Sequence, residues 1–358
     1  MFSGVKILKF SGHSYFRQRV ALSLLSSLPI RIDDIRSDTD SPGLKDFEIS
    51  LLQIAEKITN GTNIDISTSV VIKPGSLIGG KFYQACAVSR GLGYYLEFII
   101  SLAAFTKTTT NATLTGVTNN SLDIGVDRIR TVTLPLLKKF GIETGLELKI
   151  LKRGAEPLGG GEVSLVFPPV KKINPLVYAD PGYISKIRGI AYCTKVPAQT
   201  ANRLVESARS VLNPYTPDVY IYTDVYKGKD SGNSPGFGIL LVAESTTGGL
   251  FSSEITGSAG SSAEDIAKHC AAMLLAEIEK GGCVDSFHQW ITLLFMTLCS
   301  QDVSKTVFGK LNKFTVQYLR DLKTFFNITF KLVPNNQNNT VNVSCVGIGY
   351  SNINKSIV

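Results

Sequence analysis

Residue types and spacing suggest chemistry most directly in the segment Arg320-Asp321-Leu322-Lys323. Apolar residues recur around it every three or four positions, which predicts a helix near 315–326 with one buried face. Arg320, Asp321 and Lys323 would then lie toward solvent. A carboxylate beside two cations suits RNA cleavage, with Asp321 activating a 2′-hydroxyl while Arg320 and Lys323 stabilise the phosphorane charge. Charge runs are more often a solvated surface or a protein-docking patch, so catalysis here is the less favoured interpretation.

Three histidines offer weaker candidates. His13 lies in a predicted loop and has the side chain of a general base at neutral pH, although a lone loop histidine is more often merely exposed. His269 and His288 fall on predicted helices among apolar neighbours, which favours structural roles. The segment 227–232 contains two lysines and two glycines, but it lacks the P-loop consensus and is more simply interpreted as a hairpin.

Composition indicates a globular protein, since 44% of the 358 residues are hydrophobic and 18% are charged. The net charge of +8 is compatible with a polyanionic partner without establishing one. The six cysteines form no CxxC pair, so we expect no disulfide framework, metal site or cofactor. The N-terminal segment is too polar for a signal peptide, and the apolar stretches 92–105 and 290–299 are shorter than the ~20 residues of a membrane span. We therefore expect an intracellular protein with no membrane partner.

Helix and strand patterns alternate along the chain, which predicts an α/β protein. Helices are expected at 14–28 and at 47–58, the second with Leu51, Ala55 and Ile58 on one apolar face. Another pair is expected at 93–105 and 123–140, and short strands accompany each pair. A similar unit occupies 284–358. This recurrence of elements suggests repeated structural units.

The order of elements changes in the middle of the chain, where four strands accompany two helices. The second of these helices, 262–280, is expected to begin at a capping box that starts with Ser261. We predict a discontinuous large domain, 1–182 and 281–358, and an inserted α/β domain, 183–280.

Five short motifs, in their order and spacing, resemble the RNA 3′-terminal phosphate cyclase family. They are Pro29-Ile30-Arg31-Ile32; Ile35-Arg36 followed by Ser41-Pro42-Gly43-Leu44; Lys73-Pro74-Gly75-Ser76-Leu77-Ile78-Gly79-Gly80; Leu134-Pro135-Leu136-Leu137 with Gly141-Ile142; and Arg153-Gly154-Ala155-Glu156-Pro157-Leu158-Gly159-Gly160-Gly161-Glu162-Val163. The resemblance extends from near residue 5 to near residue 348. It implies a large domain of three βαβ-type repeats, related to the C-terminal domain of bacterial translation initiation factor three, with a smaller α/β domain inserted before the last repeat.

The chain departs from the family at both catalytic segments. Active cyclases have a glycine-rich loop after the first strand, where this chain places the bulky Tyr15 and Phe16, which would obstruct a phosphate. The family's nucleophile is a histidine that carries AMP; the matching segment here, 309–313, has Lys310 and no histidine. We expect no cyclase activity, with a lysyl adenylate on Lys310 or a residual cyclase as less favoured alternatives.

A cyclase scaffold without this histidine resembles the eukaryotic cyclase-like subfamily. The resemblance implies a nucleolar ribosome biogenesis factor that acts, within the small-subunit processome, in the early pre-rRNA cleavages releasing small-subunit rRNA. It also implies pre-rRNA and a nucleolar GTPase as partners. Whether the protein cuts RNA through Asp321 and its neighbours or only positions it stays open at this point.

The resemblance further implies an anion site for RNA phosphates, because the family gathers basic residues around nucleotide phosphates. The corresponding residues here are Arg17, Arg36, Arg90 and Arg128. The alternative is ordinary surface pairing of these arginines with Asp33, Asp34 or Asp127.

Overall fold

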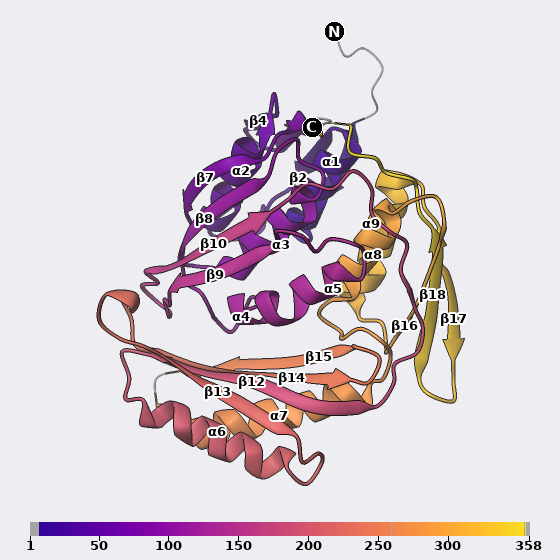
Figure 1. Cartoon of the computed structure of the whole chain (residues 1–358). Coiled ribbons are helices and arrows are strands. Elements are labelled where there is room, and N and C mark those ends of the chain that lie inside the picture. The colour runs from indigo at the N-terminus through magenta and orange to yellow at the C-terminus, as the bar shows by residue number, and fades with distance from the viewer. Residues whose placement is uncertain (1–6, 259, 354, 356–358) are drawn as a thin grey trace.

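Three four-stranded sheets with one common strand order form most of the molecule (Figure 1). The computed structural model describes residues 7–258, 260–353 and 355. In each sheet the first strand pairs in parallel with the second, and the remaining pairs are antiparallel. A parallel pair needs a crossover connection, and each repeat includes a helix in that connection.

The repeats follow one another along the chain. The first comprises β1 (Leu8–Ser11), α1 (Phe16–Ser26), β2 (Ile30–Asp33), α2 (Asp46–Ile58), β4 (Asn63–Ile66) and β5 (Val70–Lys73). The second comprises β7 (Gly80–Ala85), α3 (Leu92–Ala103), β8 (Thr110–Gly116), α4 (Val126–Arg128), η1 (Ile129–Thr133), α5 (Leu134–Lys138), β9 (Glu147–Lys152) and β10 (Gly161–Phe167). The third comprises β11 (Val177–Tyr178), α8 (Gln289–Leu298), β16 (Val303–Phe308), α9 (Lys313–Phe326), β17 (Lys331–Asn335) and β18 (Thr340–Val346). A short antiparallel pair joins β3 (Thr59–Asn60), which follows α2 inside the first repeat, to β6 (Ser76–Leu77), which lies between the first two repeats in the chain.

The helices of the three repeats pack against one another in a single hydrophobic core. α1 contacts both α3 and α9, and α9 also contacts α8. The apolar face predicted for α2 is confirmed, because Leu51, Ala55 and Ile58 are all buried. These helices hold the three sheets together as one unit, called the large unit below.

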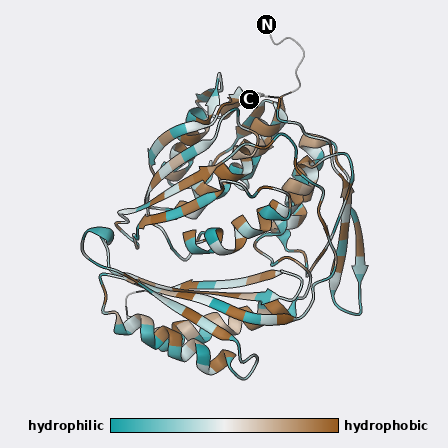
Figure 2. Ribbon diagram, in the orientation of Figure 1, coloured by the Kyte–Doolittle hydropathy of each residue, from teal (hydrophilic) through white to brown (hydrophobic). Residues whose placement is uncertain are grey.

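A fourth sheet lies in the segment between β11 and α8 and has its own core. This sheet and its helices are called the inserted unit below. Its elements are β12 (Ile184–Thr194), α6 (Gln199–Leu212), β13 (Val219–Tyr226), η2 (Gly228–Asp230), β14 (Gly236–Ser245), β15 (Leu250–Thr256) and α7 (Ala263–Glu279). The strand order is β13-β12-β14-β15, with α6 and α7 on one face and the large unit facing the other (Figure 1). Along β13, Val219 and Ile221 alternate with the more polar Tyr220 and Tyr222, whereas residues 239–243 of the central strand β14 are all hydrophobic (Figure 2).

Two local expectations are corrected. The helix predicted over 123–140 is interrupted by η1, a π-helical turn, and Pro135 stands at the N-terminal end of α5. Proline lacks a backbone N–H, so the regular α-helical bond to residue 131 cannot form, which accounts for the wider turn. The cap of α7 is Ser262 rather than Ser261, since its hydroxyl accepts the hydrogen bond of Asp265 N.

The buried Arg153 joins the inserted sheet to the large unit. Its guanidinium donates to both carboxylate oxygens of Asp127, at 2.7 and 3.1 Å, and to Asp224 of β13 at 2.9 Å. It also lies over the rings of Tyr192 and Tyr226 in the inserted sheet. Burial alone would raise the pKa of Asp127, but Arg153 outweighs that effect and the pKa is lowered. The interface therefore contains a compensated charge cluster contributed by both units.

The glycine-rich segment that follows Arg153 brings the two backbones close together. Gly232 N of the inserted unit donates to Arg153 O at 2.7 Å. A Cβ atom on Gly154 would lie 2.2 Å from Gly161 N, and one on Gly232 would lie 2.4 Å from Gly159 O. Larger residues are excluded, so in this chain the motif serves to dock the inserted unit.

Replacement of Arg153 by methionine should lower the free energy of unfolding by about 3–5 kcal/mol, because the buried Asp127 loses its counterion. Urea unfolding measures the change. Arg188→Met is the matched control, since Arg188 of β12 forms an exposed ion pair with Asp218, and it should change stability by less than about 1 kcal/mol. Similar losses in both variants would contradict the role given to Arg153.

Candidate anion site between the two units

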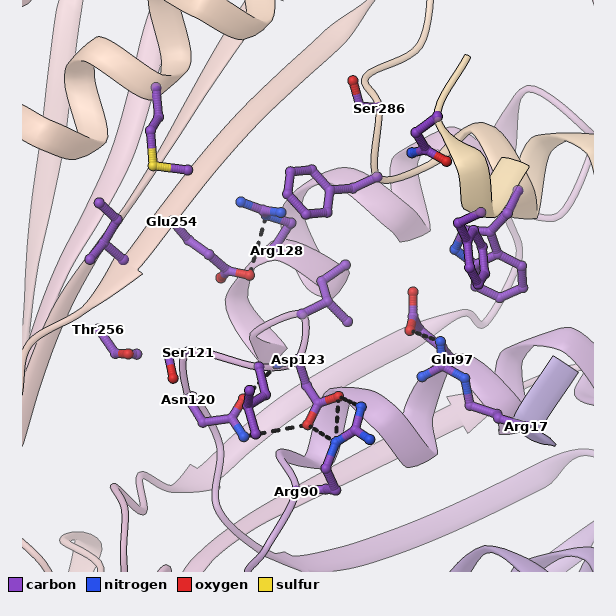
Figure 3. Close-up of a pocket in the computed structure, with 18 of the residues that line it drawn as sticks. Arg17, Arg90, Glu97, Asn120, Ser121, Asp123, Arg128, Glu254, Thr256 and Ser286 are labelled. Carbon is purple, nitrogen blue, oxygen red and sulfur yellow. Dashed lines mark hydrogen bonds and ion pairs between the residues drawn. The ribbon is translucent and has the colours of Figure 1, made fainter. Parts of the chain in front are cut away.

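A cavity of about 600 Å³ lies between the large unit and the inserted unit (Figure 3). The large unit contributes Arg17 at the start of α1, Arg90 just before α3 and Arg128 on α4. The inserted unit contributes Glu254 of β15 and His269 of α7. The site thus exists only while the two units keep their relative placement.

Each of the three arginines is paired with a carboxylate (Figure 3). The pairs are Arg17–Glu97, Arg90–Asp123 and Arg128–Glu254. The first is short, with 2.6 Å between Arg17 Nη2 and Glu97 Oε2. The third is looser, with 3.3 Å between Arg128 Nε and Glu254 Oε1. With all six groups ionised their charges cancel, so a phosphate that enters would share guanidinium groups that already have partners.

Two of these arginines still have unused donors. The Nε atoms of Arg17 and Arg128 are buried, and neither has a hydrogen-bond partner with good geometry among the described residues. Arg128 is only 2% exposed, and its guanidinium lies 4.3 Å from the centre of the Phe287 ring. A buried donor without an acceptor is unfavourable, so a small shift of either side chain toward an anion in the cavity would be favoured.

Arg36 lies outside the cavity lining. Its Nη1 and Nη2 atoms donate to the two carboxylate oxygens of Glu48 at 2.7 and 2.8 Å, and the pair is buried. The structure therefore brings together Arg17, Arg90 and Arg128 of the four expected residues. Their partners are not Asp33, Asp34 or Asp127. Binding of RNA phosphate by this group stays a prediction.

Glu254 has a raised pKa even though it faces Arg128. Burial favours the neutral carboxyl group, and the opposing effects of Arg128 and of the Gly125 N–H, 2.8 Å away, are smaller. Protonation of Glu254 would leave the cavity with excess positive charge. The attraction of the site for anions should therefore depend on pH.

The histidines occupy three different environments. His269 is exposed and lines the cavity, so the structural role predicted for it is wrong. His288 is buried, with Nδ1 2.5 Å from Asp285 Oδ1 and Nε2 2.9 Å from Thr133 Oγ1. His13 is exposed and does not line the cavity. The periodicity of α7 did not reveal His269, because it says nothing about the cavity beside the helix.

Asp321 is 2% exposed, so the prediction that it faces solvent is wrong. Its Oδ1 accepts a hydrogen bond from Gln317 Nε2 at 2.9 Å, and its Oδ2 lies 3.5 Å from Arg19 Nε on α1. Burial raises the pKa of the carboxyl group. Arg320 and Lys323 are exposed, and neither pairs with Asp321 among the described residues. The three residues of the predicted catalytic group do not converge.

Lys310, at the position of the family's nucleophile, is exposed and lies outside the cavity lining. It lines a separate groove with Lys280 and Pro334. Asn312, two residues later, does line the cavity and accepts a hydrogen bond from Thr315 N at 2.7 Å.

Within residues 7–258, 260–353 and 355, no three His, Cys, Asp or Glu side chains are grouped as a metal site. In that same part of the chain, no helix has the length and apolarity needed to cross a bilayer.

The Glu254→Gln variant should bind a short single-stranded RNA at least about fivefold more tightly than the wild type at neutral pH. A unit charge near a phosphate is worth at least ~1 kcal/mol even in bulk water. As pH falls through the raised pKa of Glu254, the wild-type affinity should approach that of the variant. Fluorescence anisotropy measures both affinities, and His269 is common to both proteins. A difference that stays constant with pH would contradict this role of Glu254.

The Asp321→Ala variant should be less stable by about 3 kcal/mol, because the largely buried Arg19 loses its carboxylate. Arg320→Ala and Lys323→Ala change exposed residues on the same helix and should each alter stability by less than about 0.5 kcal/mol. Thermal unfolding compares the three. An Asp321→Ala protein as stable as its two controls would show that the Arg19 contact is unimportant.

Comparison with known proteins agrees with the motifs and the repeated fold. The family model described as RNA 3′-terminal phosphate cyclase matches residues 8–332. The chain is 47% identical over 365 residues to the Homo sapiens "RNA 3′-terminal phosphate cyclase-like protein", covering 98% of each chain. It is 46% identical over 359 residues to the Schizosaccharomyces pombe "rRNA processing protein rcl1", covering 98% of this chain and 99% of that one. A "probable RNA 3′-terminal phosphate cyclase-like protein" of Dictyostelium discoideum is 45% identical over 369 residues, covering 98% of this chain and all of the other. Near-complete matches of this kind show that the chain belongs to the RNA 3′-terminal phosphate cyclase family.

Proposed function

We propose that the protein is an rRNA-processing factor that binds pre-rRNA in the arginine-lined cavity and does not cyclise RNA ends. One of its relatives is named an rRNA processing protein, and others are named cyclase-like. The observation that carries the proposal is the place of Lys310. The position expected for the nucleophile is occupied by a lysine that lines a different groove. The cavity is lined instead by arginines, two of which have an Nε–H group without a hydrogen-bond partner among the described residues. Such donors suit phosphate oxygens.

The resemblance to the cyclase-like subfamily supports a more specific role. We propose that the protein acts in the early cleavages that release small-subunit rRNA, in the nucleolus and within the small-subunit processome, beside a nucleolar GTPase. A fluorescently tagged chain should then concentrate in nucleoli, and the purified protein should bind the purified GTPase. A diffuse cytoplasmic signal or the absence of binding would contradict these assignments.

Binding through the three cavity arginines should weaken with salt. Three phosphate contacts to single-stranded RNA predict a slope of log K against log salt of about −2. Arg90→Gln and Arg128→Gln should each weaken binding and reduce the slope by about 0.7. Arg31→Gln is the matched control, because Arg31 is an exposed, ion-paired arginine on β2 outside the cavity. The cavity is excluded as the RNA site if the control weakens binding as much as the cavity variants do.

The less favoured alternative is cleavage of pre-rRNA with Asp321, Arg320 and Lys323. Burial of Asp321 counts against it, as does the lack of an ion pair between Asp321 and either cation in the described part of the chain. Purified protein incubated with spacer RNA in EDTA tests it. Cleavage that disappears in Asp321→Asn, a variant able to keep the Gln317 hydrogen bond, would establish a nuclease. Cleavage that persists in the variant would come from another site or a contaminant.

A residual cyclase would require a covalent adenylate on the protein. Among the described residues, His269 is the one histidine that lines the cavity, so it is the candidate to test. Incubation with labelled ATP should leave the protein unlabelled. An acid-labile adenylate that is lost in His269→Ala would overturn the assignment to a non-cyclising factor.

A further inference from the structure

The face of the inserted sheet opposite α6 and α7 carries two exposed tyrosines that do not line the arginine cavity. Tyr220 and Tyr222 of β13 are 54% and 56% exposed, and their ring centres lie 4.5 Å apart in an edge-to-face arrangement. Val219 and Ile221 alternate with them and are buried in the core of the inserted unit. Two aromatic rings therefore stand on the part of this face that the large unit leaves exposed.

The sheet is hollowed beside Tyr222. The hollow measures about 300 Å³, and its lining includes Tyr222, Arg188, Ile190, Leu240, Val242 and Leu250. In the register of β12 and β13, Arg188 lies opposite Tyr220 and Ile190 lies opposite Tyr222. Aromatic and aliphatic walls of this kind fit the flat face of a nucleobase better than a phosphate.

Charge around the two tyrosines is unevenly distributed. Arg188 pairs with Asp218 at 2.8 Å and Lys186 with Glu244 at 3.2 Å, so the cations beside the rings are neutralised. Lys227 and Lys229, immediately after β13, are exposed and form no ion pair within the described part of the chain. The surface therefore has two exposed aromatic rings along β13 and two lysines without ion pairs, among the described residues, after its C-terminal end.

The tyrosine surface lies close to the arginine cavity, with the contact of Ser252 of β15 to Asp285 of the large unit between them. Leu250 of β15 lines the hollow, and Glu254, four residues later on that strand, lines the cavity. Four strand residues span about 13 Å. Thr131 and Arg128, three residues apart, likewise line the hollow and the cavity. A single bound strand can therefore reach both places.

We propose that Tyr220 and Tyr222 are a stacking platform for unpaired bases of an RNA, with Lys227 and Lys229 contacting its phosphates beyond β13. The inference rests on the proposed function, because the RNA is the one whose phosphates the cavity holds. An open sheet face with exposed aromatic rings binds single-stranded RNA by stacking, which tolerates many sequences because every base has a flat face.

The test compares a double variant, Tyr220→Ala with Tyr222→Ala, and its phenylalanine counterpart. Anisotropy is measured with a single-stranded RNA and with an abasic strand of the same length, which keeps the phosphates and lacks the bases. The alanine variant should bind the base-bearing RNA roughly 5- to 150-fold more weakly and the abasic strand unchanged. The phenylalanine variant should match the wild type. Tyr83→Ala is the matched control, because Tyr83 is also 56% exposed but lies on β7.

The outcomes separate the platform from the cavity. Equal weakening for both strands, or none for either, overturns the platform. Weakening by Arg128→Gln but not by the tyrosine variant leaves the cavity and removes the platform, and the reverse pattern removes the cavity alone. If the tyrosine variant keeps its RNA affinity but no longer binds the purified GTPase, the surface is a protein interface and the inference is wrong. Circular dichroism verifies that every variant is folded.

Discussion

The buried Arg153, which Asp127 holds in the large unit, bonds to Asp224 of the inserted sheet and fixes the position of that sheet, and the cavity depends on that position. All six cysteines are free, so no disulfide shares the task. An exposed ion pair would contribute little, because water and salt screen it. Arg153 is instead enclosed by Tyr192 and Tyr226 and bonded to carboxylates from both units. Separating the two units would remove Asp224 and the two rings from the buried Arg153, which makes one relative placement strongly preferred.

That placement also decides how the cavity attracts an anion. Arg128 comes from the large unit and its partner Glu254 from the inserted unit, so the charge balance of the lining is set across the interface. A nearly neutral lining exerts little attraction at long range. It favours exchange of hydrogen-bond acceptors at short range, because Nε of Arg128 has only a loose ion pair with Glu254 at 3.3 Å. Long-range attraction for a polyanion must come instead from the net charge of the whole chain, +8.

The sequence predicted local structure better than contacts between distant segments. The buried face of α2 was predicted from the spacing of Leu51, Ala55 and Ile58, because helical periodicity indicates which side of a helix contacts the core. The same reasoning failed for Asp321, which is buried by Arg19 from another helix, a contact that no spacing encodes. The sequence did not predict β7 and β16, because each is a strand of six residues with polar side chains on both faces, which obscures the alternation. The resemblance to the family located Arg17, Arg90 and Arg128, but their carboxylate partners could be identified only from the structure.

The interruption of the third repeat governs the order in which the chain can become native. β11 pairs with β16, Val177 with Lys305, so its neighbour is made only after the whole inserted unit. During synthesis two repeats and the inserted unit leave the ribosome while β11 still has no partner strand. Because the inserted unit has its own core, its early collapse would shorten the loop that β11 and β16 must close and reduce the entropy lost in closing it. The third sheet is then the last to assemble, and until it does, one side of the central helices is uncovered.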